Sequence, residues 1–137
     1  MKGLILTCKH HDGFCLFDSK LTDYKSTNAP CGRDLVREFV DAVRAEGLRV
    51  GLYYSLIDWH HPDFPKYNDC NHPMRGDPAY QDEKIDFDRY LAYMHGQIEE
   101  LVTNYGKIDI LWFDYAYDEL RGEAWRATEL VRMVRRH

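Results

Sequence analysis

The stretch that decides the fold is residues 107–115, KIDILWFDY. It is short, rich in β-branched and aromatic residues and preceded by Gly106, a pattern typical of a buried strand that follows a helix. Side chains alternate along a strand, so Trp112 and Asp114 are expected on one face. Asp114 is thus expected at the C-terminal tip, where parallel α/β folds place their chemistry, although Asp is also a common cap or turn residue there.

Two further strands are predicted upstream, at residues 4–8 and 48–54. Between them, apolar residues recur at helical spacing and predict a helix with Asp34 as its N-cap. Gly47 is expected to end that helix at the first position beyond it.

Two more helices complete the pattern. The pair Asp77-Pro78 is typical of a helix start, and the helix is expected to continue to about Tyr105. The last helix is predicted over residues 123–136. Its inward side chains are expected to be Trp125, Leu130, Val131 and Val134.

The resulting order is βαβαβα, which predicts a parallel sheet. Such units occur in doubly wound sheets and in (β/α)₈ barrels. The first strand is followed by His-His-Asp-Gly at residues 10–13, with neither a G-x-G-x-x-G loop nor a Walker A lysine. This argues against nucleotide binding and favours part of a barrel.

Composition and charge narrow the classes of function that the chain can have. The chain has 137 residues, enough for one domain, and a net charge of −5 with one short basic run at its end, so nucleic acid is not expected as a partner. No stretch of 18 apolar residues is present, so no membrane span is expected. The first residues show no signal peptide, which leaves the compartment open. The four cysteines lack C-x-x-C spacing and are expected to be free thiols.

Polar and aromatic residues follow all three predicted strands. Because the C-terminal ends of parallel strands share one edge of the sheet, these residues are expected to converge on a site. They are His10, His11, Tyr53, Tyr54, Trp112 and Asp114.

Two kinds of chemistry compete for this site. Histidines suit a metal ion, and His60 and His61 in the long loop could add ligands, but adjacent histidines at a strand tip are expected to point to opposite faces. A carboxylate beside an indole, with imidazole and phenol groups nearby, suits a sugar. The donors bind hydroxyls, the ring packs on C–H groups and the carboxylate meets the anomeric carbon. The aromatic content of 14% also suits a sugar cleft.

Three motifs resemble the α-L-fucosidases of glycoside hydrolase family 29, in the family's order and at similar spacing. They are KHHDGFCL at 9–16, GLYYS at 51–55 and ILWFD at 110–114. The resemblance implies a retaining exo-α-L-fucosidase on a (β/α)₈-like barrel, of which residues 1–137 would form about three βα units. It further implies that Asp114 is the nucleophile. The residues it places around the bound fucose are His10, His11, Tyr53 and Trp112.

The resemblance also implies what the chain lacks. A retaining glycosidase needs a second carboxyl group as acid/base, and in the family this residue comes from a later segment. Asp118, Glu119 and Glu123 lie near Asp114 in sequence, but none matches a family motif. The expected ligand is a fucosylated oligosaccharide or glycoconjugate, with no cofactor and no metal. A metal-dependent barrel hydrolase or isomerase and a non-catalytic fucose-binding remnant are the alternatives.

Overall fold

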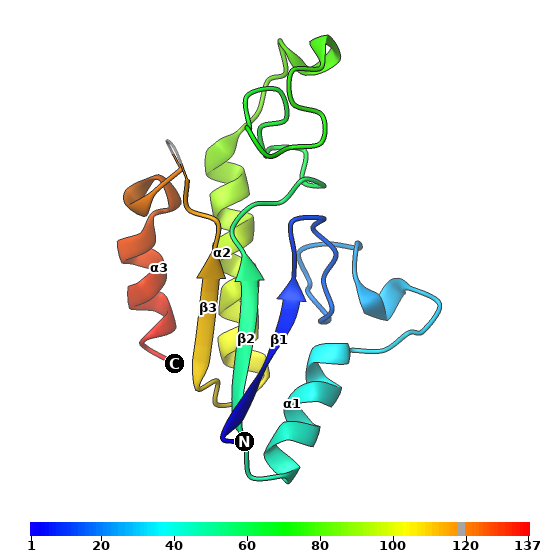
Figure 1. The fold of residues 1–137 in the computed structure, drawn as a ribbon, viewed down its shortest axis with the longest axis vertical. Helices are drawn as coiled ribbons and strands as arrows, with labels where there is room; N and C mark the ends of the chain where they lie inside the picture. The colour runs from blue at the N-terminus through cyan, green and yellow to red at the C-terminus, as the bar shows by residue number, and fades with distance from the viewer. Residues whose placement is uncertain (118–119) are drawn as a thin grey trace.

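The computed structural model describes residues 1–117 and 120–137 and contains a parallel three-stranded sheet (Figure 1). The strands, hydrogen-bonded in chain order, are β1 (Gly3–Lys9), β2 (Arg49–Ser55) and β3 (Ile110–Asp114). The helices are α1 (Leu35–Ala45), α2 (Phe87–Asn104) and α3 (Ala127–Val134), with short 3₁₀ turns η1 (Ser26–Asn28), η2 (Pro78–Tyr80) and η3 (Gly122–Trp125). The predicted βαβαβα order and the parallel pairing are confirmed.

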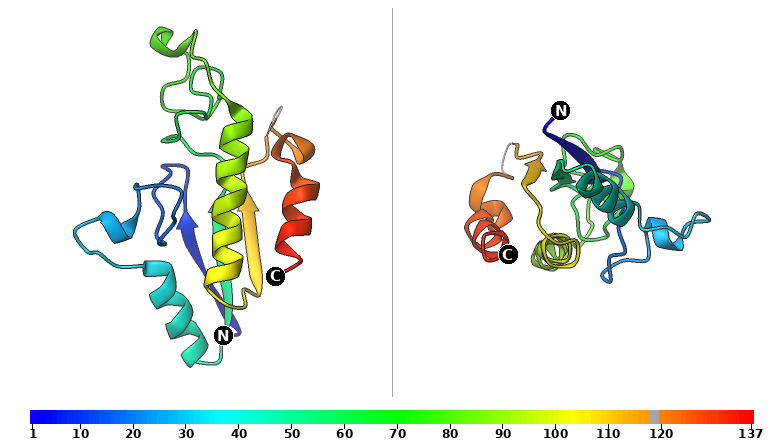
Figure 2. Two further views of the ribbon diagram at one scale, coloured as in Figure 1. Left: turned by 180° about the vertical axis from the view of Figure 1, so that it is seen from behind. Right: turned by 90° about the horizontal axis from the view of Figure 1, so that it is seen from below.

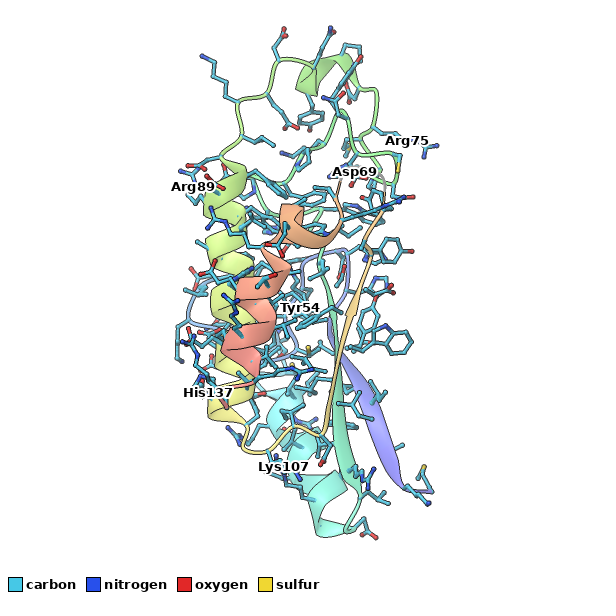
Figure 3. The ribbon with its side chains drawn as sticks, turned by 90° about the vertical axis from the view of Figure 1, so that its left-hand side faces the viewer. Tyr54, Asp69, Arg75, Arg89, Lys107 and His137 are labelled. Carbon is cyan, nitrogen blue, oxygen red and sulfur yellow. The ribbon has the colours of Figure 1, made fainter. Side chains whose placement is uncertain are left out.

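All three helices lie on the same side of the sheet, as the view from below shows (Figure 2). Val50, Leu52 and Tyr54 of β2 point toward them and are fully buried. The Tyr54 hydroxyl donates to Gln97 of α2 at 2.7 Å, and Tyr54 lies between the sheet and the helices in Figure 3. The hydrophobic core is therefore the layer between the sheet and the helices.

The opposite face of the sheet carries apolar side chains that nothing in the described residues covers. The register places Ile5, Gly51 and Ile110 in one row across the strands. Ile5 is 44% exposed and Ile110 46% exposed. We call this surface the open face. Trp112, in the next row, is 51% exposed on it.

A bulge interrupts β1 just before its end. Thr7 pairs with Tyr53, but the next paired residue is Lys9, opposite Tyr54, so Cys8 is the extra residue. The bulge turns Lys9 to the core side, where its ammonium group lies 4.6 Å from the centre of the Tyr54 ring. The residues after Lys9 consequently leave the strand as a turn, in which the Gly13 N–H donates to the His10 carbonyl at 3.1 Å.

The helix ends predicted around α1 are confirmed. The Asp34 carboxylate accepts a hydrogen bond from the backbone N–H of Arg37 at 2.9 Å and so caps the helix. Gly47 follows the helix with φ +66°, a conformation that favours glycine, and Gly106 with φ +69° follows α2 in the same way.

The predicted start of the second helix is wrong. Asp77 and Pro78 begin only the turn η2, and α2 starts at Phe87 with Asp86 as its cap. Between them, the Glu83 carboxylate accepts a hydrogen bond from the backbone N–H of Lys66 at 2.6 Å. This contact ties the intervening segment to the preceding loop, so tertiary structure overrides the local helix signal.

The last helix is also shorter than predicted. Arg126, with φ +49°, separates η3 from α3. The break follows from two contacts of Trp125: its backbone carbonyl accepts a hydrogen bond from His95 Nε2 at 2.9 Å, and its indole N–H donates to the Leu120 carbonyl. Trp125 and Leu130 are buried as expected. Val131, however, is 41% exposed, since the break rotates α3 and buries Met133 instead.

Three cysteines match the sequence prediction. Cys8 and Cys15 are buried free thiols, and Cys31 is an exposed one. Burial raises the pKa of the Cys8 thiol, and it raises the pKa of Cys15 to about 11. Neither buried thiol is therefore ionised near neutral pH, and both behave as core residues.

Candidate active site

The C-terminal ends of the three strands bring the predicted residues together. Asp114 ends β3, Ser55 ends β2 opposite it in register, and His10 directly follows β1. Figure 3 shows this end of the sheet near Asp69, with Lys107 at the other end. Tyr54, also expected here, instead points into the core.

Two donors hold the carboxylate of Asp114. The Tyr53 hydroxyl donates to Oδ2 at 2.9 Å, and the backbone N–H of Tyr115 donates to Oδ1 at 2.8 Å. Burial and the adjacent Asp114 raise the pKa of Tyr53, so its hydroxyl keeps its proton and remains a donor. These two hydrogen bonds fix the direction of the carboxylate.

The backbone conformation of Tyr115 is part of this arrangement. Its φ of +68° lies in the left-handed region, which side chains other than glycine rarely adopt. This turn directs its N–H back to Asp114 and places its ring against His11, with ring centres 4.0 Å apart. Such strain is typical of functional sites.

Aromatic rings form a row along the open face. The Trp112 and Tyr53 rings meet edge to face with centres 5.5 Å apart, and His10 stacks on Tyr53 at 5.8 Å. A row of this kind next to a carboxylate presents flat apolar surfaces and polar edges together. Both are features of carbohydrate sites.

The two histidines lie side by side, with ring centres 3.7 Å apart. The expectation that they point to opposite faces is wrong, because both follow the end of β1 and belong to a turn instead of a strand. His11 Nδ1 lies 2.7 Å from the Ser55 hydroxyl, and its ring meets the edge of Trp59. Burial, with His10 beside it, lowers the pKa of His11 to about 4, so this imidazole is neutral at neutral pH.

A buried ion pair lies next to the turn that carries His10 and His11. The Lys9 ammonium donates to Asp58 Oδ2 at 2.8 Å, and both side chains are essentially buried. Asp58 Oδ1 accepts from the backbone N–H groups of His60 and His61. Gly13, with φ +77°, packs so closely that a Cβ there would lie 2.3 Å from Asp58 Oδ1. The pair thus joins the turn to the loop after β2.

The loop histidines do not join His10 and His11. His60 stacks on Tyr24 at 4.0 Å, and His61 packs against Tyr90 and Tyr93 of α2. Within residues 1–117 and 120–137, no group of three His, Cys, Asp or Glu side chains is placed to hold a metal ion. In the same ranges, no helix is long and apolar enough to cross a membrane.

Sequence reasoning missed three residues of the site, namely Ser55, Trp59 and Tyr115. Ser55 lies two residues after Tyr53 on the same face of β2 and sits opposite Asp114, so the strand pattern could have identified it. Of the carboxylates near Asp114, Asp118 and Glu119 fall outside the described residues. Glu123 accepts from the backbone N–H of Thr128 at 3.1 Å and serves the start of α3.

The comparisons with known proteins agree on one family. All of residues 1–137 match the family model for alpha-L-fucosidase. The chain is 38% identical over 119 residues to a putative alpha-L-fucosidase 1 of Oryza sativa subsp. japonica, which covers 85% of this chain and 19% of that protein.

Solved structures agree with this match. Alpha-L-fucosidase isoenzyme 1 from Paenibacillus thiaminolyticus superposes with a TM-score of 0.98 at 65% identity, over 99% of this chain and 32% of that one. An alpha-L-fucosidase from Lactobacillus casei in complex with alpha-L-fucose product gives 0.83 at 33% identity, over 99% and 44%. The chain thus spans less than half the length of each of these relatives. It belongs to the alpha-L-fucosidase family.

Proposed function

We propose that this chain supplies the nucleophile and part of the sugar pocket of a retaining exo-α-L-fucosidase, acting on terminal α-L-fucose of oligosaccharides or glycoconjugates. Family membership supports the substrate class, as does the relative with bound alpha-L-fucose. The observation that carries the proposal is the Asp114 carboxylate, held by Tyr53 and the Tyr115 N–H beside a row of aromatic rings.

Asp114 would attack the anomeric carbon and form a covalent fucosyl-enzyme bond as the glycosidic oxygen departs. Its hydrogen bonds from Tyr53 and Tyr115 hold it in one orientation, which lowers the entropic cost of reaching the attack geometry. Water then attacks the same carbon, releasing fucose with the original anomeric configuration and regenerating the carboxylate.

His10, His11 and Trp112 would surround the sugar in this proposal. The imidazoles would hydrogen-bond hydroxyl groups, and the exposed indole of Trp112 would pack against the C–H face. A retaining enzyme also needs an acid/base carboxyl about 5–5.5 Å from the nucleophile. We assign this role to a residue outside the 137, because the family resemblance places the acid/base in a later segment.

A (β/α)₈ barrel would complete this site. Sequential strand order and helices confined to one side are the arrangement of a barrel wall, whose other face lines the barrel interior. The open face would then be covered by side chains of the remaining strands. The C-terminal ends of the strands would form the floor of the active site.

Chemical rescue tests the proposal in a full-length enzyme that carries this chain. Asp114→Gly should lower kcat by about 10³-fold or more, and azide should restore part of the activity by occupying the vacated space and attacking the sugar. The azide product should be β-fucosyl azide. Asp41→Ala, which removes an exposed carboxylate on α1, is the control and should behave as the parent. Near-normal turnover of Asp114→Gly would refute the assignment.

A further inference from the structure

Ser55 occupies a position between the two halves of the site. It ends β2, its Cα pairs with that of Asp114, and its side chain is fully buried. Its hydroxyl oxygen lies 2.7 Å from His11 Nδ1 and 3.1 Å from the backbone carbonyl of Ile57. Tyr53, two residues earlier, orients Asp114. One strand end therefore contacts both the carboxylate and the imidazole.

The two contacts of Ser55 determine where the His11 proton lies. A serine hydroxyl has one hydrogen to donate. The Ile57 carbonyl can only accept a hydrogen bond. Ile57 is fully buried, and the donor that the structure shows for its carbonyl is the Ser55 hydroxyl. The hydroxyl hydrogen therefore goes to Ile57, and the short contact with His11 requires Nδ1–H to donate to Ser55. The reverse arrangement would leave a buried carbonyl without a hydrogen-bond partner, which is unfavourable.

The other nitrogen of His11 is then a bare acceptor. The imidazole is neutral near pH 7, because burial outweighs the carboxylates of Asp114, Asp12 and Asp69, which act in the opposite direction. In the described residues Nε2 contacts no hydrogen-bond partner. Three buried side-chain atoms of the described residues have no hydrogen-bond partner, namely Trp59 Nε1, Asp69 Oδ2 and Glu100 Oε2. His11 Nε2 is not among them, so this unpaired nitrogen is not fully buried. Nε2 is thus accessible to a ligand.

We propose that Ser55 is a positioning residue that fixes His11 as the Nδ1–H tautomer, so that His11 Nε2 accepts a hydrogen bond from a sugar hydroxyl. The inference rests on the proposed fucosidase function and adds a rule of recognition to it. The group that meets His11 must be a donor. A ligand with an acceptor alone at that position, such as an ether oxygen or fluorine, leaves Nε2 unpaired.

The tautomer can be measured directly in the full-length enzyme. Long-range ¹H–¹⁵N spectra of the His11 ring at pH 7 should show Nδ1 protonated and Nε2 unprotonated in the ligand-free parent. In Ser55→Ala both tautomers should be populated, while Ser55→Thr, which keeps the hydroxyl, should retain the parent pattern. Ser19→Ala also removes a fully buried serine hydroxyl, one that accepts from Gln97, and it should leave His11 unchanged.

Kinetics and binding supply the second readout. Ser55→Ala should raise KM for an aryl α-L-fucoside about tenfold, the size of one hydrogen bond, with a smaller change in kcat. Binding of deoxy and deoxyfluoro analogues of L-fucose should be measured with the parent and with His11→Ala. The hydroxyl that His11 binds is the one whose removal weakens binding to the parent but not to His11→Ala. At that position the fluoro analogue should bind as weakly as the deoxy one.

Three results would overturn the inference: an Nε2–H tautomer in the parent, a pure Nδ1–H tautomer in Ser55→Ala, or tight binding of that fluoro analogue. If Ser55→Ala does not fold, the parent spectrum and Ser55→Thr still decide the matter. Failure of the proposed function would look different. In that case the His11 spectrum would be as stated, while Asp114→Gly would show no azide rescue.

Discussion

The phenol of Tyr53 and the carboxylate of Asp114 belong to neighbouring strands, are 61 residues apart in sequence and lie 2.9 Å apart in space. The contact depends on register, because Tyr53 pairs with Trp112 and its side chain must reach two positions along the neighbouring strand to meet Asp114. The hydroxyl remains protonated near neutral pH, since burial and Asp114 both raise its pKa. Tyr53 is therefore a permanent donor to the proposed nucleophile.

Replacing Tyr53 by Phe should slow turnover. The change removes a hydrogen bond to a charged group, worth about 1.5–3 kcal/mol, which corresponds to about a tenfold to hundredfold fall in kcat. Steady-state kinetics on an aryl α-L-fucoside in the full-length enzyme measures it. Tyr54→Phe is the matched control, since Tyr54 points into the core, and it should lower the melting temperature while leaving kcat intact. Equal kcat in Tyr53→Phe and the parent would exclude a role for this contact.

His10→Ala and His11→Ala should each impair fucoside hydrolysis in an enzyme that still folds. The expected loss is about tenfold to a few hundredfold in kcat/KM, since each removes hydrogen bonding to the sugar. Because hydroxyl binding needs no metal, EDTA should leave the parent activity unchanged. Activity lost in EDTA and restored by zinc or manganese would support the metal-dependent alternative instead.

Acid should destabilise the loops around the site. Burial lowers the pKa of His11 to about 4 and also lowers the pKa values of His61 and His72, compared with about 6.5 in an unfolded chain. Between those pH values the unfolded chain binds more protons than the folded protein, so stability falls as pH drops from 6.5 toward 4. Urea unfolding of the full-length enzyme at several pH values should show this fall in the free energy of unfolding.

His11→Gln should flatten that slope, because it removes one of the groups that must take up a proton on unfolding. His137→Gln, at an exposed histidine, is the control. An NMR titration of the His11 ring with a midpoint near 6.5 would contradict the expected burial effect.

The 137 residues expressed by themselves should aggregate and lack activity. Ile5, Ile110 and Trp112 are about half exposed on the open face, and the two outer strands present unpaired backbone groups along their outer edges. Activity should also be absent if the acid/base partner of Asp114 lies outside these residues, as proposed, since loss of such a group costs about 10²–10⁴ in rate. Refolding, size-exclusion chromatography and an aryl α-L-fucoside assay test both points. A soluble monomer that melts cooperatively and turns over substrate would contradict them.

The sequence predicted the features that depend on local rules. The cap at Asp34, the stop at Gly47 and the three parallel strands follow from residue types and spacing, and the structure confirms them. Convergence of His10, Tyr53, Trp112 and Asp114 at one end also followed, because parallel strands share their C-terminal edge. Their roles in catalysis remain predictions.

What the sequence could not predict arises from contacts between distant segments. The Lys9–Asp58 pair joins residues 49 positions apart. Glu83 holds the segment before α2 against Lys66, so the cap of the helix is Asp86 instead of the expected Asp77. His10 and His11 lie side by side because they belong to the turn after β1, where the alternation of side chains along a strand no longer applies. Each case is one in which tertiary contacts outweigh a local preference.

The bulge at Cys8 has a consequence for how this segment tolerates changes in length. If Cys8 were kept but paired with Tyr54 in strict alternation, Lys9 would stand opposite Ser55, out of the core, and its charge would separate from Asp58. Deleting Cys8 would instead leave Lys9 opposite Tyr54, on the core side. The extra residue is therefore dispensable for the direction of Lys9, whereas the pairing of Lys9 with Tyr54 is not. What the site requires of β1 is this register, more than the number of residues in the strand.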